Sequence, residues 1–247
     1  MRACPICHIE NPIVTTILDR EEYTKCVKCG LLYTHADVSI SDFDTYYDGG
    51  REEGKNYQDG YIADAEEHRR NVNLAKEMQL LSGEAWTDKN ILEVGSSAGY
   101  LLLSAQRLGA HVRGIEISKY ASNYANEVLG ISTVCMNWES FDLEAEKWNN
   151  YFDFLLMSHV IEHFVHPVEA IQKVAEALKP GGAWISQHPD ASVYPGVKFH
   201  VRDHTPNEHL QIFDEHTILK ISEPLDFKRV LYKQEEPGQS ISVFRII

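Results

Sequence analysis

The sequence predicts an α/β protein with a doubly wound, seven-stranded sheet in which one strand runs antiparallel to the rest. From residue 89 to residue 247, short apolar runs alternate with segments of helical periodicity, which is typical of a parallel sheet with crossover helices. Residues 91–100 join one apolar run to a helix through a turn bracketed by Gly95 and Gly99. The turn-rich residues 235–240 separate the last two apolar runs, which favours a hairpin and hence one reversed strand.

The strands are expected at 90–94, 111–117, 133–136, 152–158, 183–187, 227–233 and 240–246. The helices are expected near 62–81, 99–109, 118–129, 167–179 and 214–222. Ser118 is a suitable N-cap for the helix that follows it. Gly109 and Gly130 suit positions just after a helix. The Pro-Gly-Gly run at 180–182 ends the helix that begins near residue 167.

The chain divides into a cysteine-rich ribbon at 1–40, a linker with a helical lid at 41–88, and the α/β domain at 89–247. The formal net charge is −14, from 23 Lys+Arg against 37 Asp+Glu, which disfavours binding to nucleic acid. No apolar run approaches the roughly 18 residues of a membrane-spanning helix, so no membrane partner is expected. The start has no apolar leader, which predicts a cytoplasmic protein with reduced thiols.

Four of the five cysteines form two C-x-x-C pairs, Cys4/Cys7 and Cys26/Cys29, with 18 residues between them. This spacing is typical of a zinc ribbon, in which each tight turn supplies two thiolates. A site with four protein ligands is closed, so the zinc is expected to be structural. Bound iron or a redox-active dithiol is the alternative. The fifth cysteine, Cys135, is expected to be a buried strand residue.

The glycine turn narrows the choice of nucleotide. The dinucleotide fingerprint G-x-G-x-x-G, started from Gly95, fails at Ser97 and Tyr100, and the phosphate-binding loop G-x-x-x-x-G-K-[ST] is absent from the sequence. The pattern that fits is acidic-x-G-x-G-x-G. Glu93, Gly95 and Gly99 occupy three of its four marked positions, and Ser97 stands at the fourth.

This pattern resembles motif I of class I S-adenosylmethionine-dependent methyltransferases, and the similarity extends through most of 90–247. Three further landmarks carry it: Glu116 at the end of the second strand, the Pro-Gly-Gly run, and an FD…EH…P stretch at 152–167. The stretch is similar to those of ubiquinone-biosynthesis O-methyltransferases and of sugar and natural-product methyltransferases. The resemblance implies a Rossmann-like methyltransferase fold and S-adenosylmethionine as cofactor.

The resemblance also implies where the cofactor lies. The backbone from Gly95 to Gly99 would pass under its methionine part, because glycine permits close approach and positive φ. Glu116 would hold the ribose, since a carboxylate can accept two hydrogen bonds from a vicinal diol. Ile117 and residues 136–138 would flank the adenine. The implied cofactor residues are Glu93, Gly95, Ser97, Gly99, Tyr100, Glu116, Ile117, Asn137, Trp138, Ser158 and His159.

Eight of the twelve histidines lie between residues 159 and 216. His159 to His163 match H-x-x-E-H, a zinc-protease motif, but Pro167 disfavours the helix that this motif needs. Some ubiquinone-type O-methyltransferases bind a divalent metal in this stretch, so His159, Glu162 and His163 are an alternative catalytic metal site. Otherwise Glu162 and His163 would shape the floor of the cofactor pocket.

Residues 187–213 form a connection that is too long for a simple crossover. It leaves the carboxyl end of the sheet, where such folds bind ligands. It contains His188, Tyr194 and His209, and the family resemblance points to His209 as an active-site residue. A hydroxyl acceptor benefits from a base, and histidine suits that task near neutral pH. We therefore predict that His163 or His209 is the base and that His188 and Tyr194 orient the substrate.

These features predict methyl transfer from S-adenosylmethionine to a small molecule, by in-line displacement. The expected acceptor is a hydroxyl of a sugar, nucleotide-sugar, glycan or related metabolite. Two other functions stay open. One is an RNA or protein methyltransferase that grips its substrate with the ribbon; the other is a non-catalytic binding module, for which Ser97 is the only support. The acceptor atom and the oligomeric state stay open too.

Overall fold

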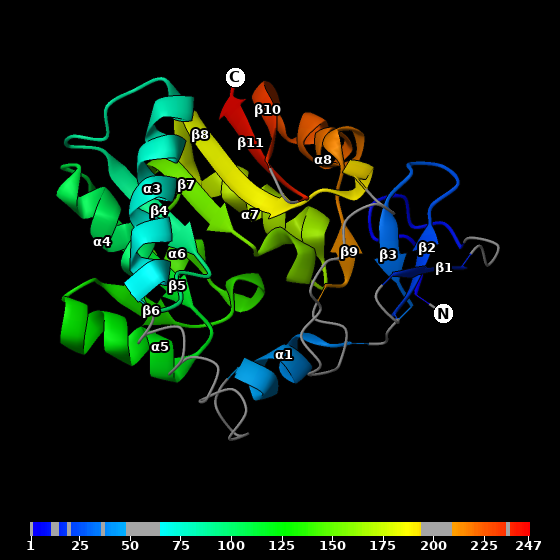
Figure 1. The fold of residues 1–247 in the computed structure, drawn as a ribbon, viewed down its shortest axis with the longest axis horizontal. Helices are drawn as coiled ribbons and strands as arrows, with labels where there is room; N and C mark the ends of the chain where they lie inside the picture. The colour runs from blue at the N-terminus through cyan, green and yellow to red at the C-terminus, as the bar shows by residue number, and fades with distance from the viewer. Residues whose placement is uncertain are drawn as a thin grey trace.

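In a computed structural model, the chain folds into a seven-stranded sheet and a four-stranded sheet with helices around them (Figure 1). The structure describes residues 2–10, 15–18, 21–35, 38–47, 65–193, 209–235 and 238–247. The predicted site residue Tyr194 lies outside these ranges, as do residues 48–64 of the expected lid. Within the described ranges, no helix is long and apolar enough to cross a membrane.

The larger sheet confirms the predicted doubly wound topology. Its strands are β4 (Asn90–Val94), β5 (His111–Glu116), β6 (Thr133–Cys135), β7 (Phe152–Ser158), β8 (Leu178–Pro189), β10 (Phe227–Glu235) and β11 (Gln239–Ile246). They lie in the order β10-β11-β8-β7-β4-β5-β6, and within this sheet β11 alone runs in the direction opposite to the other six strands. The chain order reverses between β4 and β7, so their carboxyl ends flank the crevice where such sheets bind ligands.

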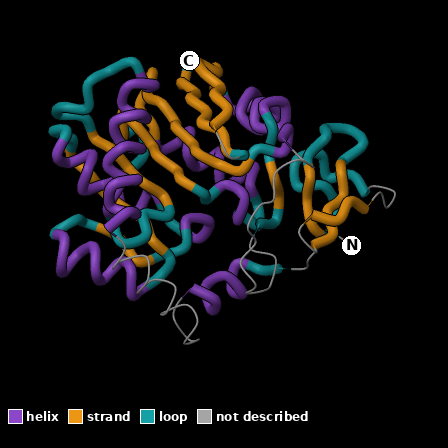
Figure 2. Tube along the Cα trace, viewed as in Figure 1, coloured by secondary structure: helices purple, strands orange, loops and turns teal. Residues whose placement is uncertain are grey.

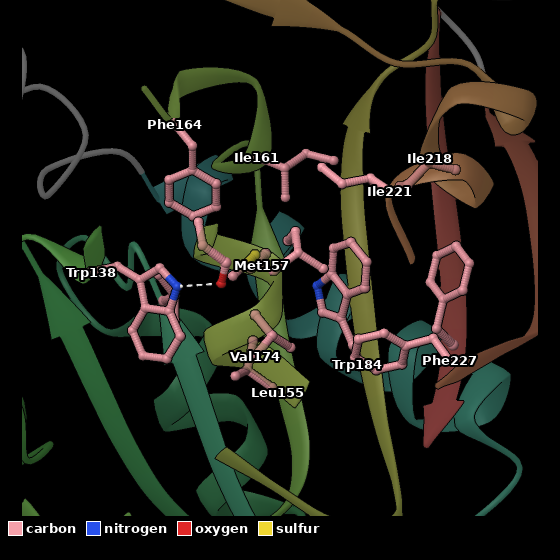
Figure 3. Close-up of a cluster of buried hydrophobic side chains, with 14 of the residues drawn as sticks. Trp138, Leu155, Met157, Ile161, Phe164, Val174, Trp184, Ile218, Ile221 and Phe227 are labelled. Atoms are coloured by element: carbon pink, nitrogen blue, oxygen red, sulfur yellow. Dashed lines mark hydrogen bonds between the residues drawn. The ribbon is translucent and has the colours of Figure 1, made fainter. Parts of the chain in front are cut away.

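Alternating side chains of the central strands pack against helices on opposite faces of this sheet. On one face, Leu155 and Met157 of β7 pack with α7 (Pro167–Ala177) and α8 (Glu215–Ser222), in the cluster drawn in Figure 3. On the other face, Phe154 and Leu156 of the same strand belong to a cluster with α3 (Ala65–Ser82) and α4 (Tyr100–Arg107). Because strand side chains point alternately to the two faces, one strand serves both layers.

The ends of the helix after β5 agree with the predicted caps. Ser118 Oγ accepts a hydrogen bond from the N–H of Ala121 at 3.4 Å, at the start of α5 (Lys119–Tyr124). The helix continues as a π-helical turn over Ala125–Leu129 and ends at Gly130, whose φ is 66°. Glycine adopts this left-handed conformation without the steric cost of a Cβ, which explains its place after the helix.

The strand β8 differs from the predicted strand 183–187, because it begins at Leu178, directly after α7. The Pro-Gly-Gly run therefore lies within the strand and not in a turn before it. The register of the β7–β8 pair shifts just after Phe152, and Gly181 in the run has a φ of 77°. The glycines thus accommodate an irregularity at the amino end of β8, as glycine often does at a bulge.

The smaller sheet joins the N-terminal ribbon to the α/β domain. Its strands are β1 (Thr15–Leu18), β2 (Glu21–Lys25), β3 (Leu32–Thr34) and β9 (Gln211–Ile212), in that order. All three pairings are antiparallel. The fourth strand comes from far along the chain, since Leu32 pairs with Ile212 and Tyr33 with Gln211. The ribbon and the α/β domain therefore share one sheet and lie side by side (Figure 2).

The position of Cys135 differs from the prediction. The side chain is exposed, whereas the sequence predicted a buried strand residue. Cys135 is the last residue of β6, which forms one edge of the large sheet. An edge strand has a neighbouring strand on one side only, so its side chains are less covered than those of a central strand.

Candidate active site

The glycine turn after β4 closes against the neighbouring strand and the loop after β7. The N–H groups of Gly95 and Ser96 both donate to the carbonyl of Ile115, at 2.8 and 3.1 Å. Gly95 has a φ of 71°, and a Cβ placed there would lie 2.5 Å from Cγ2 of Val160. Glycine is therefore required at this position, by both the backbone conformation and the close approach of Val160.

Two backbone N–H groups hold the carboxylate of Glu116. Ser97 donates to Oε2 and Ser118 donates to Oε1, each at 2.7 Å. Burial raises the pKa of Glu116, and these two donors oppose the rise. Each carboxylate oxygen has a second acceptor position, so the group is oriented to accept further hydrogen bonds, such as those of a ribose.

Ser97 takes the backbone conformation that the family pattern assigns to glycine. Its φ is 47°, in the left-handed region that side chains with a Cβ rarely adopt. In this conformation its N–H reaches Glu116. Serine therefore makes this contact at the cost of local backbone strain.

Two buried polar atoms at this turn have no hydrogen-bond partner among the described residues: Glu93 Oε2 and Ser96 Oγ. Burial raises the pKa of Glu93 well above its ordinary value, and the nearby Glu116 raises it further. Buried polar atoms are normally satisfied by protein, water or ligand. Orphaned oxygens beside a glycine turn and an oriented carboxylate fit a cofactor with several donor groups, as S-adenosylmethionine has.

The loop after β6 contains Asn137 and Trp138, which the family resemblance placed near the adenine. Their side chains lie in different surroundings. Trp138 is 3% exposed, and its Nε1 donates to the carbonyl of Ala170 at 3.0 Å (Figure 3). The indole therefore belongs to the core beneath α7 and offers no face to a cofactor, which corrects its predicted role. Asn137 Nδ2 donates to Asp44 Oδ1 at 3.1 Å and ties this loop to α1 (Ile40–Tyr47).

Several polar atoms of the remaining implied cofactor residues are paired with protein groups. Ile117 directly follows β5 and is half-buried. The hydroxyl of Tyr100 lies 3.1 Å from that of Tyr124. Ser158 Oγ donates to Gln187 Oε1 at 3.0 Å, across β7 and β8.

Glu162, His163 and His209 form a cluster beyond the carboxyl end of β7. The first two belong to the short 3₁₀ helix Ile161–His163, and the third lies just before β9. Their possible ligand atoms all lie within 4.8 Å of one another, and the two imidazole centroids are 4.9 Å apart. The sequence named each histidine as a candidate base, and the structure brings both of them to one carboxylate.

The charges in this cluster depend on burial and on mutual contact. Glu162 is fully buried, and its Oε1 lies 3.2 Å from Nδ1 of His159. Burial alone would raise the pKa of Glu162, but His159, His163 and His209 outweigh it and lower the pKa to about 2. Burial, and to a lesser extent the nearby His163, lower the pKa of His209 to about 4. At neutral pH, His209 is therefore a neutral imidazole beside an ionised carboxylate.

The same three residues offer a donor set that divalent transition metals accept, one carboxylate and two imidazoles. The sequence placed His159 in such a set with Glu162 and His163, and the structure puts His209 in that position instead. A zinc-protease site of the H-x-x-E-H type needs both histidines on one α-helix. This segment is a three-residue 3₁₀ helix, which excludes that reading.

The ring nitrogens of His188 contact groups outside the Glu162–His163–His209 cluster. The ring is fully buried, with Nδ1 3.0 Å from the carbonyl of Pro189 and Nε2 3.3 Å from Ser242 Oγ. Burial also lowers its pKa, so the ring is a neutral part of the core. Because both nitrogens face protein atoms, His188 has no ring nitrogen left to orient a substrate.

The four ribbon cysteines converge on one point. Their sulfur atoms all lie within 4.8 Å of one another, and Cys4 Sγ is 3.6 Å from Cys29 Sγ. Tetrahedral zinc with Zn–S bonds of about 2.3 Å requires S–S separations of about 3.8 Å. The contact between these two thiols lowers the pKa of Cys4 and raises that of Cys29, as expected when one proton is shared.

The two cysteine pairs adopt the same turn. In each, the N–H four residues after the first cysteine donates to that cysteine's carbonyl at 2.8 Å, from His8 to Cys4 and from Gly30 to Cys26. Both donors have positive φ, 55° for His8 and 83° for Gly30. A repeated turn that aims two thiols from each segment at one point is the arrangement that a tetrahedral metal needs.

Sequence reasoning missed two contacts of the cofactor crevice. Ser118 was identified only as a helix cap, although its N–H also orients Glu116. Asp44 was not singled out, and the sequence holds no signal that links it to Asn137, 93 residues away. Ser118 does carry a local signal: as the N-cap residue two positions after Glu116, its backbone N–H lies close to the end of β5.

Comparisons with known proteins agree on one family. The sequence model of the family described as "Methyltransferase domain" matches residues 66–232. A ubiquinone biosynthesis O-methyltransferase of Paraburkholderia xenovorans is 31% identical over 101 residues, 40% of this chain and 43% of that protein. Its counterpart in Colwellia psychrerythraea is 30% identical over 103 residues, 41% of this chain and 42% of that protein. The match thus spans less than half the length of these relatives.

Solved structures share the fold over more of the chain. A Burkholderia thailandensis 1,6-didemethyltoxoflavin-N1-methyltransferase has a TM-score of 0.60 and 13% identity, and the alignment covers 92% of this chain and 99% of that one. An S-adenosylmethionine-dependent methyltransferase from Archaeoglobus fulgidus has a TM-score of 0.58 and 14% identity, with 71% and 94% covered. At these identities the likeness shows the fold alone.

Proposed function

This chain belongs to the class I S-adenosylmethionine-dependent methyltransferase family, and we propose that it transfers the methyl group of S-adenosylmethionine to a hydroxyl of a small molecule. The observation that carries the proposal is the contact between two parts of the crevice. Val160 lies against Gly95 of the glycine turn, and Glu162 and His163 follow it two and three residues later. The candidate bases therefore stand next to the turn that would hold the cofactor's methionine part.

The cofactor, when bound, supplies a methyl group that is already activated by its sulfonium charge. Glu116, oriented by the N–H groups of Ser97 and Ser118, would accept hydrogen bonds from the ribose. His163 or His209 would take the proton of the acceptor hydroxyl as its oxygen gains the methyl group, whose bond to the sulfonium sulfur breaks to leave a neutral thioether. The buried Glu162 carboxylate then stabilises the positive imidazolium.

A hydroxyl acceptor is favoured by the relatives, which are named as O-methyltransferases. Within that class we propose a sugar, nucleotide-sugar, glycan or related metabolite. A metal ion at Glu162, His163 and His209 would instead bind the acceptor oxygen directly. The two mechanisms differ in whether a chelator abolishes turnover.

For the ribbon we propose one structural zinc ion held by Cys4, Cys7, Cys26 and Cys29. The sulfur positions and the paired turns support it. Thiolate ligands must stay reduced, so we propose the cytoplasm as the compartment. With all four positions taken by thiolates, this zinc would be structural and would not bind a substrate.

The test combines cofactor binding with methyl transfer. Radiolabelled S-adenosylmethionine is incubated with a catechol, a nucleotide-sugar, an oligosaccharide, total RNA and a protein mixture, and labelled products are separated by size. We expect label on a small hydroxylated acceptor. Label on RNA or protein would establish the alternative enzyme class, and cofactor binding without any labelled product would establish a non-catalytic module.

The base is tested by single-turnover rates of His163→Ala and His209→Ala, with the exposed His216→Ala as the matched control. Loss of the base should slow methyl transfer by about 10²-fold or more without weakening cofactor binding. Rates of both variants within about threefold of the wild type would remove the histidines from the mechanism.

A further inference from the structure

The turn after β7 carries Glu162 and His163. Residues from another part of the chain, at β9, donate hydrogen bonds to the backbone carbonyl groups of this turn. Gln211 Nε2 donates to the carbonyl of Ile161 at 3.0 Å and to that of Phe164 at 2.9 Å. The N–H of Leu210 donates to the carbonyl of Glu162 at 2.8 Å. Both donor residues belong to β9 or directly precede it, so β9 sets the position of the turn.

Gln211 suits this role through its burial and its chemistry. The side chain is 0% exposed, and both N–H bonds of its amide point at the turn. Its Oε1 lies 3.5 Å from Nη2 of Arg2, which donates to the carbonyl of Val165 at 2.7 Å. Without Gln211, two buried carbonyls would lack their donor, and such unsatisfied groups are expensive in a protein interior.

The ribbon holds the other half of the cluster. The hydroxyl of Tyr23, on β2, donates to the carbonyl of His209 at 2.9 Å. Tyr33, on β3, pairs with Gln211 in the shared sheet. Tyr33 also belongs to the buried cluster that contains Cys4, Cys26 and Cys29. A folded ribbon therefore fixes the His209 backbone directly and the turn with His163 through Gln211.

We propose that Gln211 is a positioning residue, which transmits the folded state of the four-cysteine ribbon to the Glu162–His163–His209 cluster. The inference rests on the proposed function only in taking this cluster as the catalytic one. When the ribbon loses its order, β3 no longer supports β9, and the two histidines are no longer held together. The cofactor turn at 93–99 is held by β5 instead, so cofactor binding persists.

The test uses Gln211→Leu, which keeps the approximate size of the side chain and removes both donors. Gln172→Leu is the matched control, because the exposed Gln172 side chain donates to the exposed Glu176 on the same helix, α7. Histidine-selective NMR on the full chain follows the imidazole signals of His163 and His209. Hydrogen exchange follows the amide of Leu210.

We expect Gln211→Leu to shift both imidazole signals and to speed exchange of the Leu210 amide by about tenfold or more, since buried hydrogen bonds are lost. The control should match the wild type in both readouts. The dissociation constant for S-adenosylmethionine should stay within about twofold in both variants, because the cofactor turn has separate supports.

Cys29→Ser tests the link from the ribbon and should shift the same imidazole signals. If the signals of Gln211→Leu coincide with those of the wild type while its melting temperature falls, Gln211 has only a structural role. If only the signals of Cys29→Ser are unshifted, the link from the ribbon is refuted. Failure of the proposed function looks different: the spectral shifts are present, and no hydroxyl acceptor is methylated.

Discussion

The N–H of Ser97 donates to Oε2 of Glu116 at 2.7 Å, and this bond joins the turn after β4 to the end of β5. Ser97 makes the bond from a φ of 47°. The left-handed conformation costs a residue with a Cβ roughly 1–2 kcal/mol. The carboxylate that we propose to hold the ribose is thus oriented by a strained residue, where glycine would make the same bond without strain.

Replacing Ser97 with glycine should therefore stabilise the protein. We expect Ser97→Gly to raise the free energy of unfolding by up to about 1 kcal/mol, reduced by the greater entropy of an unfolded glycine. Urea denaturation measures it. Ser140→Gly is the control, because Ser140 is exposed in the 3₁₀ helix Trp138–Ser140 and should lose stability on the same change. Equal destabilisation of both variants would show that Ser97 carries no strain.

Removal of the Glu116 carboxylate should weaken cofactor binding. We expect Glu116→Ala to raise the dissociation constant for S-adenosylmethionine by about 10- to 100-fold, since hydrogen bonds to a charged group are worth roughly 1.5–3 kcal/mol. Calorimetry measures it. Glu127→Ala, at an exposed position of the same α/β domain, should leave the constant unchanged. An unchanged constant for Glu116→Ala would place the ribose elsewhere.

The parts that the sequence predicted are those set by local patterns. Strand β4, the glycine turn and the Ser118 cap each follow from residues that are neighbours in the chain. The two-residue strand β9 has no periodicity to detect, and its partner β3 lies about 180 residues earlier. For the same reason, the meeting of His163 with His209 depends on tertiary packing that spacing alone does not encode.

Trp138 illustrates the opposite error. Its place after β6 implied a contact with adenine, and local sequence cannot say which way a side chain at a strand end points. The helix α7 decides it, because the carbonyl of Ala170 accepts the indole N–H and the ring is covered. A buried indole usually finds such an acceptor, so packing between distant elements overrode the family expectation.

The half-buried His209 should make stability depend on pH. Burial lowers the pKa of His209 from 6.5 to about 4, so the unfolded chain binds the extra proton first. The contribution of His209 to stability is therefore fully present above pH 6.5 and is lost as the pH drops toward 4, by up to about 1.4 kcal/mol per pH unit. The contribution of Glu162 to stability is lost at lower pH, between 4.5 and about 2, because its pKa falls from 4.5 to about 2 on folding.

We expect His209→Asn to flatten the pH dependence of unfolding between pH 6.5 and pH 4.5, measured by urea denaturation at a series of pH values. Some slope should persist, because burial also lowers the pKa of His188. His216→Asn, at an exposed position of α8, should keep the wild-type slope. Identical slopes for His209→Asn and the wild type would mean that His209 is not buried as a neutral ring.

Metal removal should unfold the ribbon, because that segment packs around its cysteines. We expect one zinc ion per chain by elemental analysis and a melting temperature that falls by about 5 °C or more after chelation, since about 1 kcal/mol corresponds to about 2–4 °C in a chain of this size. Cys4→Ser should lose the metal. Cys135→Ser should keep it, because that thiol is exposed on β6 and distinct from the four-cysteine cluster. Visible absorbance from bound iron, or a reversible disulfide between paired cysteines in place of metal, would establish the rival chemistry of the ribbon.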